Sequence, residues 1–493
     1  MLQSLEKFTG VREPNISDRR RQTSGDLTSA FGFQHANLKP PILPGTTGHL
    51  GLAKYEADNL PRPLFPGADQ QQPKQETGSQ KRIGNAPCPS LTPRLVNHEK
   101  RTIDMQKFLA TLPMILLLPL GPQAQQSAPP EDLLVHINQI QVIGTHNSYH
   151  TGIAASERKL IEQQNPKAMR ALDYAHAPLG DQLSGGVRQL EIDVYADSKG
   201  GRYSHPAIVA KVAARGLPAD PDFDPNHEMD KPGFKVMHVL NFDQRSSCHT
   251  FIACLSSIRS WSEQHPEHLP IFILVETKQG RAGTPATADG PEPFTSATFD
   301  ALDAEIRSVF SAAEMITPDQ VRGSHDTLVE AIEPSASSAA GKRSGGWPTL
   351  EEARGKVVFL MDQRPVEAVY TEGHRALRGR LIFTNATPGA PDAAFTEENS
   401  GTKEEIDALA RQGYLIRTRT DDGTEEARSN DHTRADIALS SGAQMLSTDY
   451  PSSEPAKWTG FFVGLRGGLV ARCNPVTAPP GCVDALLEPS GSK

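Results

Sequence analysis

Three absences in the sequence each exclude a class of protein. There is no excess of positive charge, because 50 Lys and Arg residues against 59 Asp and Glu residues give a formal net charge of −9. Binding to nucleic acid through its phosphates needs a basic field, so we expect no nucleic-acid partner. The five cysteines show no C-x-x-C spacing, which argues against a structural zinc site. The apolar run 108–120 is too short for a membrane span and is broken by Pro113 and Pro119.

The same apolar run has the flanks of a secretory signal peptide. Met105 and one basic residue, Lys107, precede it, and small and polar residues follow it. We therefore predict a signal peptide over 105–124, with cleavage near Ala124, and a secreted or periplasmic protein. A short buried helix is the alternative interpretation.

Residues 1–104 have the composition of a chain without a core. They are rich in Pro, Gln, Asn and Arg and show no sustained helical or strand period. A signal peptide normally begins a chain, so we interpret Met105 as the natural start and 1–104 as a disordered leader translated from upstream. A genuine disordered extension is the alternative.

Export predicts disulfides, since the compartment outside the cytoplasm is oxidising. Cys88 falls in the leader, and the other four cysteines form two close pairs, Cys248 with Cys254 and Cys473 with Cys482. We predict one disulfide in each pair, the second within a C-terminal tail, 471–493. Two cysteines six positions apart in one helix lie too far apart to bridge, so Cys248 should precede the helix that contains Cys254.

Between residues 132 and 470 the chain alternates short apolar runs with longer stretches of helical spacing. This alternation predicts a single (β/α)8 barrel of the α/β class with loop insertions, although a doubly wound open sheet would show the same pattern. The expected helices are 250–264, 296–310, 403–413 and 433–442. The eight expected strands are 140–145, 187–195, 234–239, 270–278, 356–361, 381–385, 414–420 and 443–450.

Polar residues stand near the ends of six of these strands, where barrel enzymes build their active sites. Glu191 and Asp193 are two positions apart in one strand and therefore point to the same side. Two carboxylates on one side of a barrel repel each other unless a cation or proton lies between them. The full set at the strand ends is His146, Asn147, Glu191, Asp193, His238, Glu276, Lys278, Arg417, Arg419, Thr448 and Asp449.

Four of these residues offer only oxygen atoms to a metal. Oxygen ligands suit hard cations, with one Ca²⁺ expected ahead of Mg²⁺ where several carboxylates and loose geometry combine. The histidines would then remain for proton transfer, and the cations at the same rim would suit an anionic phosphodiester. The four oxygen donors are Asn147, Glu191, Asp193 and Glu276.

The segments "GTHNSYH", "LEIDV", "VMH" and "VETK", in this order, resemble the barrel of phosphatidylinositol-specific phospholipase C. The secreted, calcium-dependent bacterial branch is the most similar. The resemblance implies two catalytic histidines, His146 and His238, and calcium ligation by the four oxygen donors. It also implies that Lys278 contacts phosphate or inositol hydroxyls and that Arg417 binds the headgroup.

The implied reaction begins with attack of the inositol 2-hydroxyl on the neighbouring phosphorus. Glu191 or Glu276 would act as the base, His146 as the acid on the leaving diacylglycerol, and His238 would stabilise the pentacovalent phosphate. The product would be a cyclic inositol phosphate, which water can open. Transient membrane contact would come from barrel loops, with 197–233 and 279–293 as candidates, and we expect a monomer.

Two other functions are compatible with the sequence. A glycerophosphodiester phosphodiesterase also combines a Glu-x-Asp metal pair with two histidines in a barrel, but its first strand usually ends in a His-Arg type pair. A secreted binding protein on the same barrel would be expected to have lost members of the catalytic set, and here the set is complete.

Overall fold

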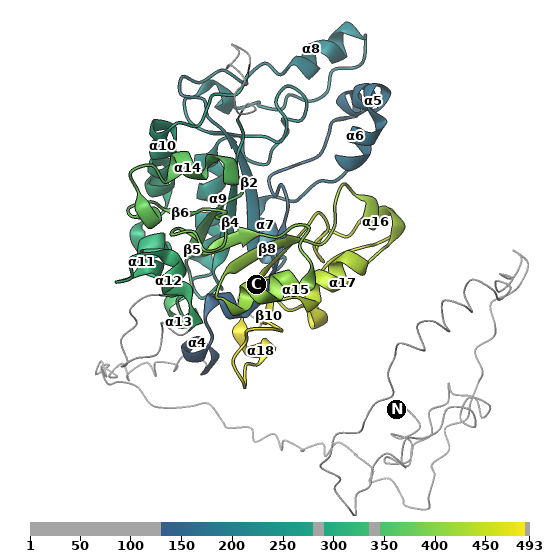
Figure 1. Ribbon diagram of the computed structural model, residues 1–493. Coiled ribbons are helices and arrows are strands. Elements are labelled where there is room, and N and C mark those ends of the chain that lie inside the picture. The colour runs from purple at the N-terminus through teal and green to yellow at the C-terminus, as the bar shows by residue number, and fades with distance from the viewer. Residues whose placement is uncertain (1–129, 280–289, 335–345, 489–493) are drawn as a thin grey trace, which may run out of the picture. The chain divides into compact units, whose positions relative to one another are not determined.

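The computed structural model describes residues 130–279, 290–334 and 346–488 (Figure 1). The expected leader, the signal peptide over 105–124 and Cys88 lie outside these residues. Within them, no helix combines the length and the apolar character needed to cross a membrane.

Eight parallel strands form the centre of the molecule. Their order in the sheet is β6-β5-β4-β2-β1-β9-β8-β7, and a parallel bridge between Asn385 and Phe395 links β6 to β7 at the two edges. The predicted barrel of the α/β class is thereby confirmed. The strands are β1 (Ile140–Thr145), β2 (Gln189–Tyr195), β4 (Ile271–Thr277), β5 (Val357–Met361), β6 (Ile382–Phe383), β7 (Phe395–Glu397), β8 (Leu415–Arg419) and β9 (Met445–Thr448).

One of the eight predicted barrel strands, 234–239, was wrong. The run 234–239 forms only β3 (Lys235–Val236), which pairs antiparallel with β2 and is not a barrel strand. Its place among the eight is taken by β7, whose three residues pair in parallel with β8. A strand of three residues is too short to show the alternation by which strands are recognised in a sequence.

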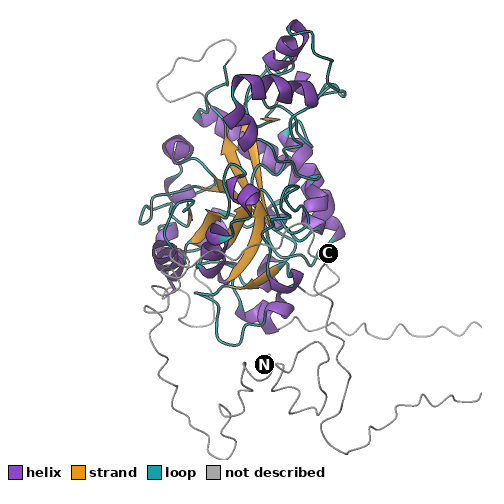
Figure 2. Cartoon of the chain, turned by 90° about the vertical axis from the view of Figure 1, so that its right-hand side faces the viewer, coloured by secondary structure: helices purple, strands orange, loops and turns teal. Residues whose placement is uncertain are grey.

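Helices surround the strands, as Figure 2 shows. Parallel strands are buried on both faces, which explains why β1, β2 and β5 are buried at every position. The helices are α4 (Pro130–Leu134), α5 (Ala155–Gln164), α6 (Pro166–Ala171), α7 (Leu179–Ser184), α8 (Ala207–Ala214), α9 (Phe251–Gln264), α10 (Ser296–Val309), α11 (Pro318–Arg322), α12 (Leu328–Ile332), α13 (Leu350–Ala353), α14 (Glu367–Tyr370), α15 (Lys403–Arg411), α16 (Glu425–Ser429), α17 (Thr433–Ser440) and α18 (Asp484–Leu487).

The C-terminal segment packs against the barrel. Strand β10 (Ala471–Cys473) pairs antiparallel with β1, and α18 contacts both β10 and α4. The buried side chain of Arg188, just before β2, forms an ion pair with Glu488. These contacts tie the end of the chain to the face of the barrel where the parallel strands begin.

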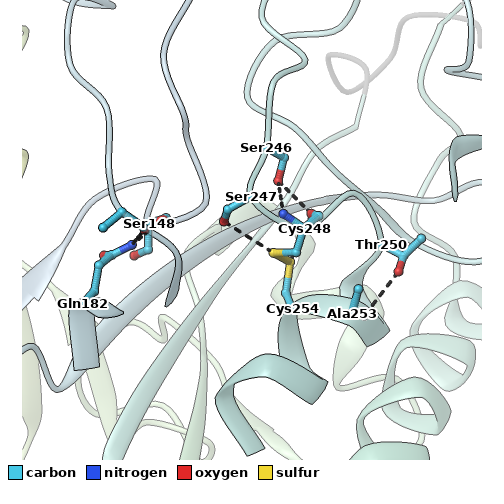
Figure 3. The surroundings of a disulfide bond; sticks show 9 residues. Ser148, Gln182, Ser246, Ser247, Cys248, Thr250, Ala253 and Cys254 are labelled. Atoms are coloured by element: carbon cyan, nitrogen blue, oxygen red, sulfur yellow. Dashed lines mark hydrogen bonds between the residues drawn. A yellow bond between two sulfur atoms is a disulfide. The ribbon is translucent and has the colours of Figure 1, made fainter. Parts of the chain in front are cut away.

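Both predicted disulfides are present, and Figure 3 shows the first of them. Cys248 is bonded to Cys254, and Cys473 is bonded to Cys482. Helix α9 begins at Phe251, so Cys248 lies in the loop before it, as expected. The hydroxyl of Thr250 caps the helix by accepting a hydrogen bond from the Ala253 amide.

Candidate functional site

Three carboxylates meet where β2 and β4 end. Glu191 and Asp193 come from β2, Glu276 comes from β4, and each offers an oxygen within 4.8 Å of the others. The register of the two parallel strands sets Asp193 directly opposite Glu276. Asp193 is fully buried and Glu191 is 3% exposed. The side-chain direction expected from the Glu-x-Asp spacing therefore holds in the structure.

Asp193 stands out among these carboxylates. Its Oδ1 atom is buried and accepts no hydrogen bond from any residue that the structure describes. Burial and the neighbouring Glu276 raise the pKa of Asp193 well above its ordinary value. A buried carboxylate with an unused oxygen, beside two others, is a place where a cation would lower the electrostatic energy. The all-oxygen donor set fits Ca²⁺.

Two cationic side chains lie against this cluster. The Lys278 Nζ atom is 2.9 Å from Oδ2 of Asp193 and 2.7 Å from Oε2 of Glu276. Burial would lower the pKa of Lys278, but the two carboxylates outweigh it and raise the pKa. Arg417 of β8 is almost fully buried and donates to Glu191 and, at 2.8 Å, to Oδ1 of Asn399. Both residues expected to contact substrate thus lie at the carboxylate cluster.

Asn147 follows β1 and lies on the same side of the barrel. Its φ of +47° is in the left-handed region, which Asn tolerates better than most residues. The Asn147 amide donates to the Tyr174 hydroxyl at 2.7 Å, and its Oδ1 accepts from Tyr149 at 3.5 Å. Burial, followed by the nearby Asp193, raises the pKa of Tyr149 well above its usual range. The Tyr149 hydroxyl therefore interacts with both the Asn147 side chain and Asp193.

His146 points at the cluster with a carboxylate behind it. Its Nδ1 is 2.8 Å from Oδ1 of Asp449, which follows β9, and its Nε2 is 3.7 Å from Oε1 of Glu191. The side chain is 22% exposed, so one edge is open to the barrel mouth. Burial, and then the positive charge of Arg419, lower the pKa of His146 well below its ordinary value. An Asp-backed imidazole of this kind transfers protons readily.

His238 is the second histidine and has its own carboxylate. Its Nδ1 is 2.9 Å from Oδ2 of Asp243, while Oδ1 of Asp243 is 3.0 Å from Nε2 of the fully buried His150. Burial alone would raise the pKa of Asp243, but the two imidazoles lower it below the ordinary range. Asp243 is therefore a carboxylate that fixes the His238 ring and leaves its Nε2 for the mouth.

No pattern in the sequence indicated Asp243, His150 or the partnership of Asp449 with His146. His150 lies within the quoted "GTHNSYH" segment, and Asp243 follows His238 by five positions. Their closeness in sequence to His146 and His238 is the one feature that could have indicated a role at the site. Only the turn that folds 239–243 back, with Val239 bridged to Asp243, brings the carboxylate to the ring.

A cavity of about 750 Å³ lies apart from these residues. It runs beside α8 and is lined by apolar residues such as Val212, Leu217 and Phe223 and by the ion pair of Glu157 with Arg245. None of the expected site residues lines it.

The Cys248–Cys254 disulfide supports the segment that carries Asp243. Ser246 is bridged to His150, and the Ser247 amide donates to the Tyr149 carbonyl at 2.8 Å. The segment between Asp243 and Cys248 is thereby held against the chain that follows β1, with the disulfide at its end (Figure 3).

Removing this disulfide should therefore affect both stability and turnover. We expect the Cys248→Ser/Cys254→Ser variant to lose about 2 kcal/mol of unfolding free energy, from the closed loop length, and to show a reduced kcat. The Cys473–Cys482 disulfide closes a loop of similar length far from His238. The Cys473→Ser/Cys482→Ser variant should therefore lose similar stability and keep its kcat. Denaturant unfolding and steady-state kinetics measure the two effects. Equal kcat losses in both variants would contradict the link to Asp243.

A family model matches most of the folded chain. Residues 135–475, more than half of the chain, match the family described as phosphoinositide phospholipase C, Ca²⁺-dependent. The chain belongs to this family. The resemblance stated from the sequence is confirmed, and the family's dependence on Ca²⁺ agrees with the carboxylate cluster at the barrel mouth.

Individual relatives of this chain are distant or matched over short stretches. The calcium-dependent phosphoinositol-specific phospholipase C of a Pseudomonas species shares 16% identity at a TM-score of 0.41, over 70% of this chain and 98% of that one. The enzyme of Streptomyces antibioticus shares 18% identity at a TM-score of 0.40, over 64% and 94%. A non-hemolytic phospholipase C of Pseudomonas aeruginosa is 44% identical over 79 residues, a match that spans only 11% of that relative and 16% of this chain.

Proposed function

We propose that the protein is a secreted phosphodiesterase that cleaves phosphatidylinositol between glycerol and phosphate. Family membership supports this function together with one structural observation. Two histidines, each backed by an aspartate, lie at the same barrel mouth as a cluster of three carboxylates. Phosphoryl transfer within a substrate needs a base, an acid and compensation of phosphate charge, and this constellation offers all three.

The carboxylates and Asn147 are the proposed calcium ligands. Asp193 supplies an oxygen that accepts no hydrogen bond from the described residues. Glu191 and Glu276 supply oxygens from β2 and β4, and Asn147 supplies one just after β1. One bound Ca²⁺ would lower the pKa of the inositol 2-hydroxyl and neutralise charge on the phosphate oxygens, which is worth several kcal/mol in the transition state.

The proton can travel within the chain's own residues. Glu191 accepts the proton of the 2-hydroxyl as its oxygen bonds to phosphorus, and His146 Nε2 lies 3.7 Å from Oε1 of Glu191. His146 takes this proton from Glu191 at Nε2 and passes it to the diacylglycerol oxygen as the bond from that oxygen to phosphorus breaks. Asp449 stabilises the imidazolium through Nδ1. His238, held by Asp243, donates to the phosphate oxygens.

The two cations have different tasks in this proposal. Lys278 is 19% exposed, so its Nζ can contact a phosphate oxygen or an inositol hydroxyl. The Arg417 side chain is 4% exposed and bonded to Glu191, so it acts on the headgroup mainly by holding Glu191 in position. The two disulfides support export, and the proposed state is a monomer that contacts the membrane transiently.

Product analysis tests the reaction. The chain from about residue 126 (after the proposed signal peptide) is offered phosphatidylinositol and glycerophosphoinositol in parallel, with Ca²⁺ or with a chelator, and phosphorus NMR follows the products. We expect a cyclic inositol phosphate that appears only with Ca²⁺. Release of glycerol phosphate would assign the protein to the glycerophosphodiester phosphodiesterases instead. Turnover that chelation leaves unchanged would overturn the proposed ligand set.

A further inference from the structure

We propose that His176 is a positioning residue, which holds the peptide bond between His146 and Asn147. This inference rests on the proposed function, in which His146 is the acid and Asn147 is a calcium ligand. One buried imidazole then sets the places of two groups that the reaction needs. In this proposal His176 contacts neither the substrate nor the metal, and it acts through the main chain of these two residues.

The His176 ring is buried between two hydrogen-bond acceptors. Its Nε2 is 3.0 Å from the backbone carbonyl oxygen of His146, and its Nδ1 is 2.7 Å from Oε2 of Glu454. The exposed fraction of the His176 side chain is 0%. A carbonyl oxygen can only accept a hydrogen bond, so Nε2 carries a proton and donates it to His146. The ring is therefore fixed through both of its nitrogens.

The carbonyl that His176 contacts belongs to the peptide bond before Asn147. The φ of Asn147 is +47°, in the left-handed region, so this turn of the main chain depends on the contacts around it. The backbone amide of His146 donates to the Thr448 carbonyl at 3.1 Å. The main chain of His146 is thus held by β9 at its amide and by His176 at its carbonyl. Without the second contact the peptide plane can rotate, and the side chains on both sides of it move as well.

Glu454 connects this arrangement to the segment that follows β9. One of its carboxylate oxygens faces Nδ1 of His176, and the other accepts a hydrogen bond from the Ala177 amide at 3.1 Å. The same segment supplies Asp449, whose Oδ1 is 2.8 Å from Nδ1 of His146. The segment therefore holds the His146 ring directly through Asp449, and the His146 carbonyl indirectly through His176.

Two replacements of similar length isolate the hydrogen bond to His146. The Nε2 atom of glutamine lies as many bonds from Cα as Nε2 of histidine, so His176→Gln keeps a donor for the carbonyl. Methionine has a side chain of the same length without a donor, so His176→Met removes the hydrogen bond. Both variants lose the contact of Nδ1 with Glu454. A role limited to filling the core therefore predicts the same kcat and Ca²⁺ affinity for both.

The same two replacements at His268 are the matched control. His268 is also fully buried, with Nε2 2.7 Å from the Ser262 hydroxyl and Nδ1 2.6 Å from the Leu269 carbonyl oxygen. It lies just before β4, at the end of the barrel where the parallel strands begin. His268→Met should lower the melting temperature about as much as His176→Met does. It should leave Ca²⁺ affinity and kcat unchanged.

Calorimetric titration without substrate measures the Ca²⁺ affinity, and release of the cyclic inositol phosphate measures kcat. His176→Met should lower the Ca²⁺ affinity by about 10- to 100-fold, the range for a residue that orients a metal ligand. Its kcat should fall by about 100-fold, the typical effect of a misplacement of about 1 Å. His176→Gln should keep values close to those of the wild type, because its contact with His146 remains. His176→Leu also lacks a donor and repeats the test if His176→Met does not fold.

Crystal structures of the two His176 variants give a readout that needs neither Ca²⁺ nor turnover. The peptide bond between His146 and Asn147 should be displaced in His176→Met and unchanged in His176→Gln. An undisplaced peptide bond in His176→Met would overturn the inference, as would equal losses of Ca²⁺ affinity and kcat in both variants. A wild type that releases no cyclic inositol phosphate would refute the proposed function. A displacement confined to His176→Met would still support the positioning role.

Discussion

Replacing His238 with alanine is expected to lower kcat by about 100- to 10,000-fold, the range typical of a single proton-transfer group. The ring is fixed by Asp243, which is itself held by His150, so its Nε2 has a defined direction. The ring makes no ion pair with Glu191, Asp193 or Glu276 in the part of the chain that the structure describes. Calcium affinity should therefore persist in the variant, and the loss should appear in kcat.

The matched control for His238→Ala is His265→Ala. His265 lies at the end of α9, where its ring stacks on Trp261 at 4.2 Å between centroids, away from the barrel mouth. It should keep its kcat. Asp243→Asn should also lower kcat, because an amide no longer selects the tautomer that leaves Nε2 available. A His238→Ala variant with near wild-type turnover would remove His238 from the mechanism, whatever Asp243→Asn does.

The barrel could be predicted from the sequence because its strands are buried on both faces and read as continuous apolar runs. β4, with seven residues from Ile271 to Thr277, was expected at 270–278. The wrong prediction of a barrel strand over 234–239 has the same origin. The run "FKVMHV" is apolar enough for a barrel strand, but only Lys235 and Val236 join the sheet, where they pair antiparallel with β2. Apolar composition predicts burial well and predicts the pairing partner poorly.

The candidate site was predictable where it depends on strand periodicity. Glu191 and Asp193 share a face because strands alternate, and their approach to Glu276 follows from the β2–β4 register. The partners of the histidines come from loops and from strands distant in the chain, as with His146 and Asp449. No local pattern encodes such a contact. The ion pairs of Lys278 and Arg417 likewise depend on side-chain conformations that spacing does not fix.

Asp193→Asn is expected to lower Ca²⁺ affinity and turnover without lowering the stability of the metal-free protein. With one carboxylate charge removed, Ca²⁺ affinity should fall steeply, because ligand charge sets that affinity. Turnover should fall on the order of 1,000-fold, the equivalent of several kcal/mol of metal-derived stabilisation. In chelator, however, the variant should be at least as stable as the wild type. The replaced carboxylate is buried beside like charges, and its Oδ1 accepts no hydrogen bond from the described residues. Its ion-pair partner, Lys278, keeps its pair with Glu276 at 2.7 Å.

Asp303→Asn is the matched control, because Asp303 is an equally buried aspartate that lies in α10, outside the cluster of three carboxylates. It accepts a hydrogen bond from the Tyr370 hydroxyl at 2.9 Å and lies 3.4 Å from Nη1 of Arg380. Its replacement should cost about 1 to 3 kcal/mol, the penalty for breaking buried polar contacts. Thermal unfolding with and without Ca²⁺ compares the two variants.

Ca²⁺ bound only to the folded state raises the free energy of unfolding, by about 2.7 kcal/mol at a hundred times its dissociation constant. The wild type and Asp303→Asn should both show this shift, and Asp193→Asn should lose it at the same Ca²⁺ concentration. The Ca²⁺ shift of the unfolding free energy would then be lost on replacing Asp193, as expected of a metal ligand, and kept on replacing Asp303, as expected of a structural residue. A Ca²⁺ shift retained in Asp193→Asn, or a loss of stability in chelator equal to that of Asp303→Asn, would show that Asp193 serves the fold and not the metal.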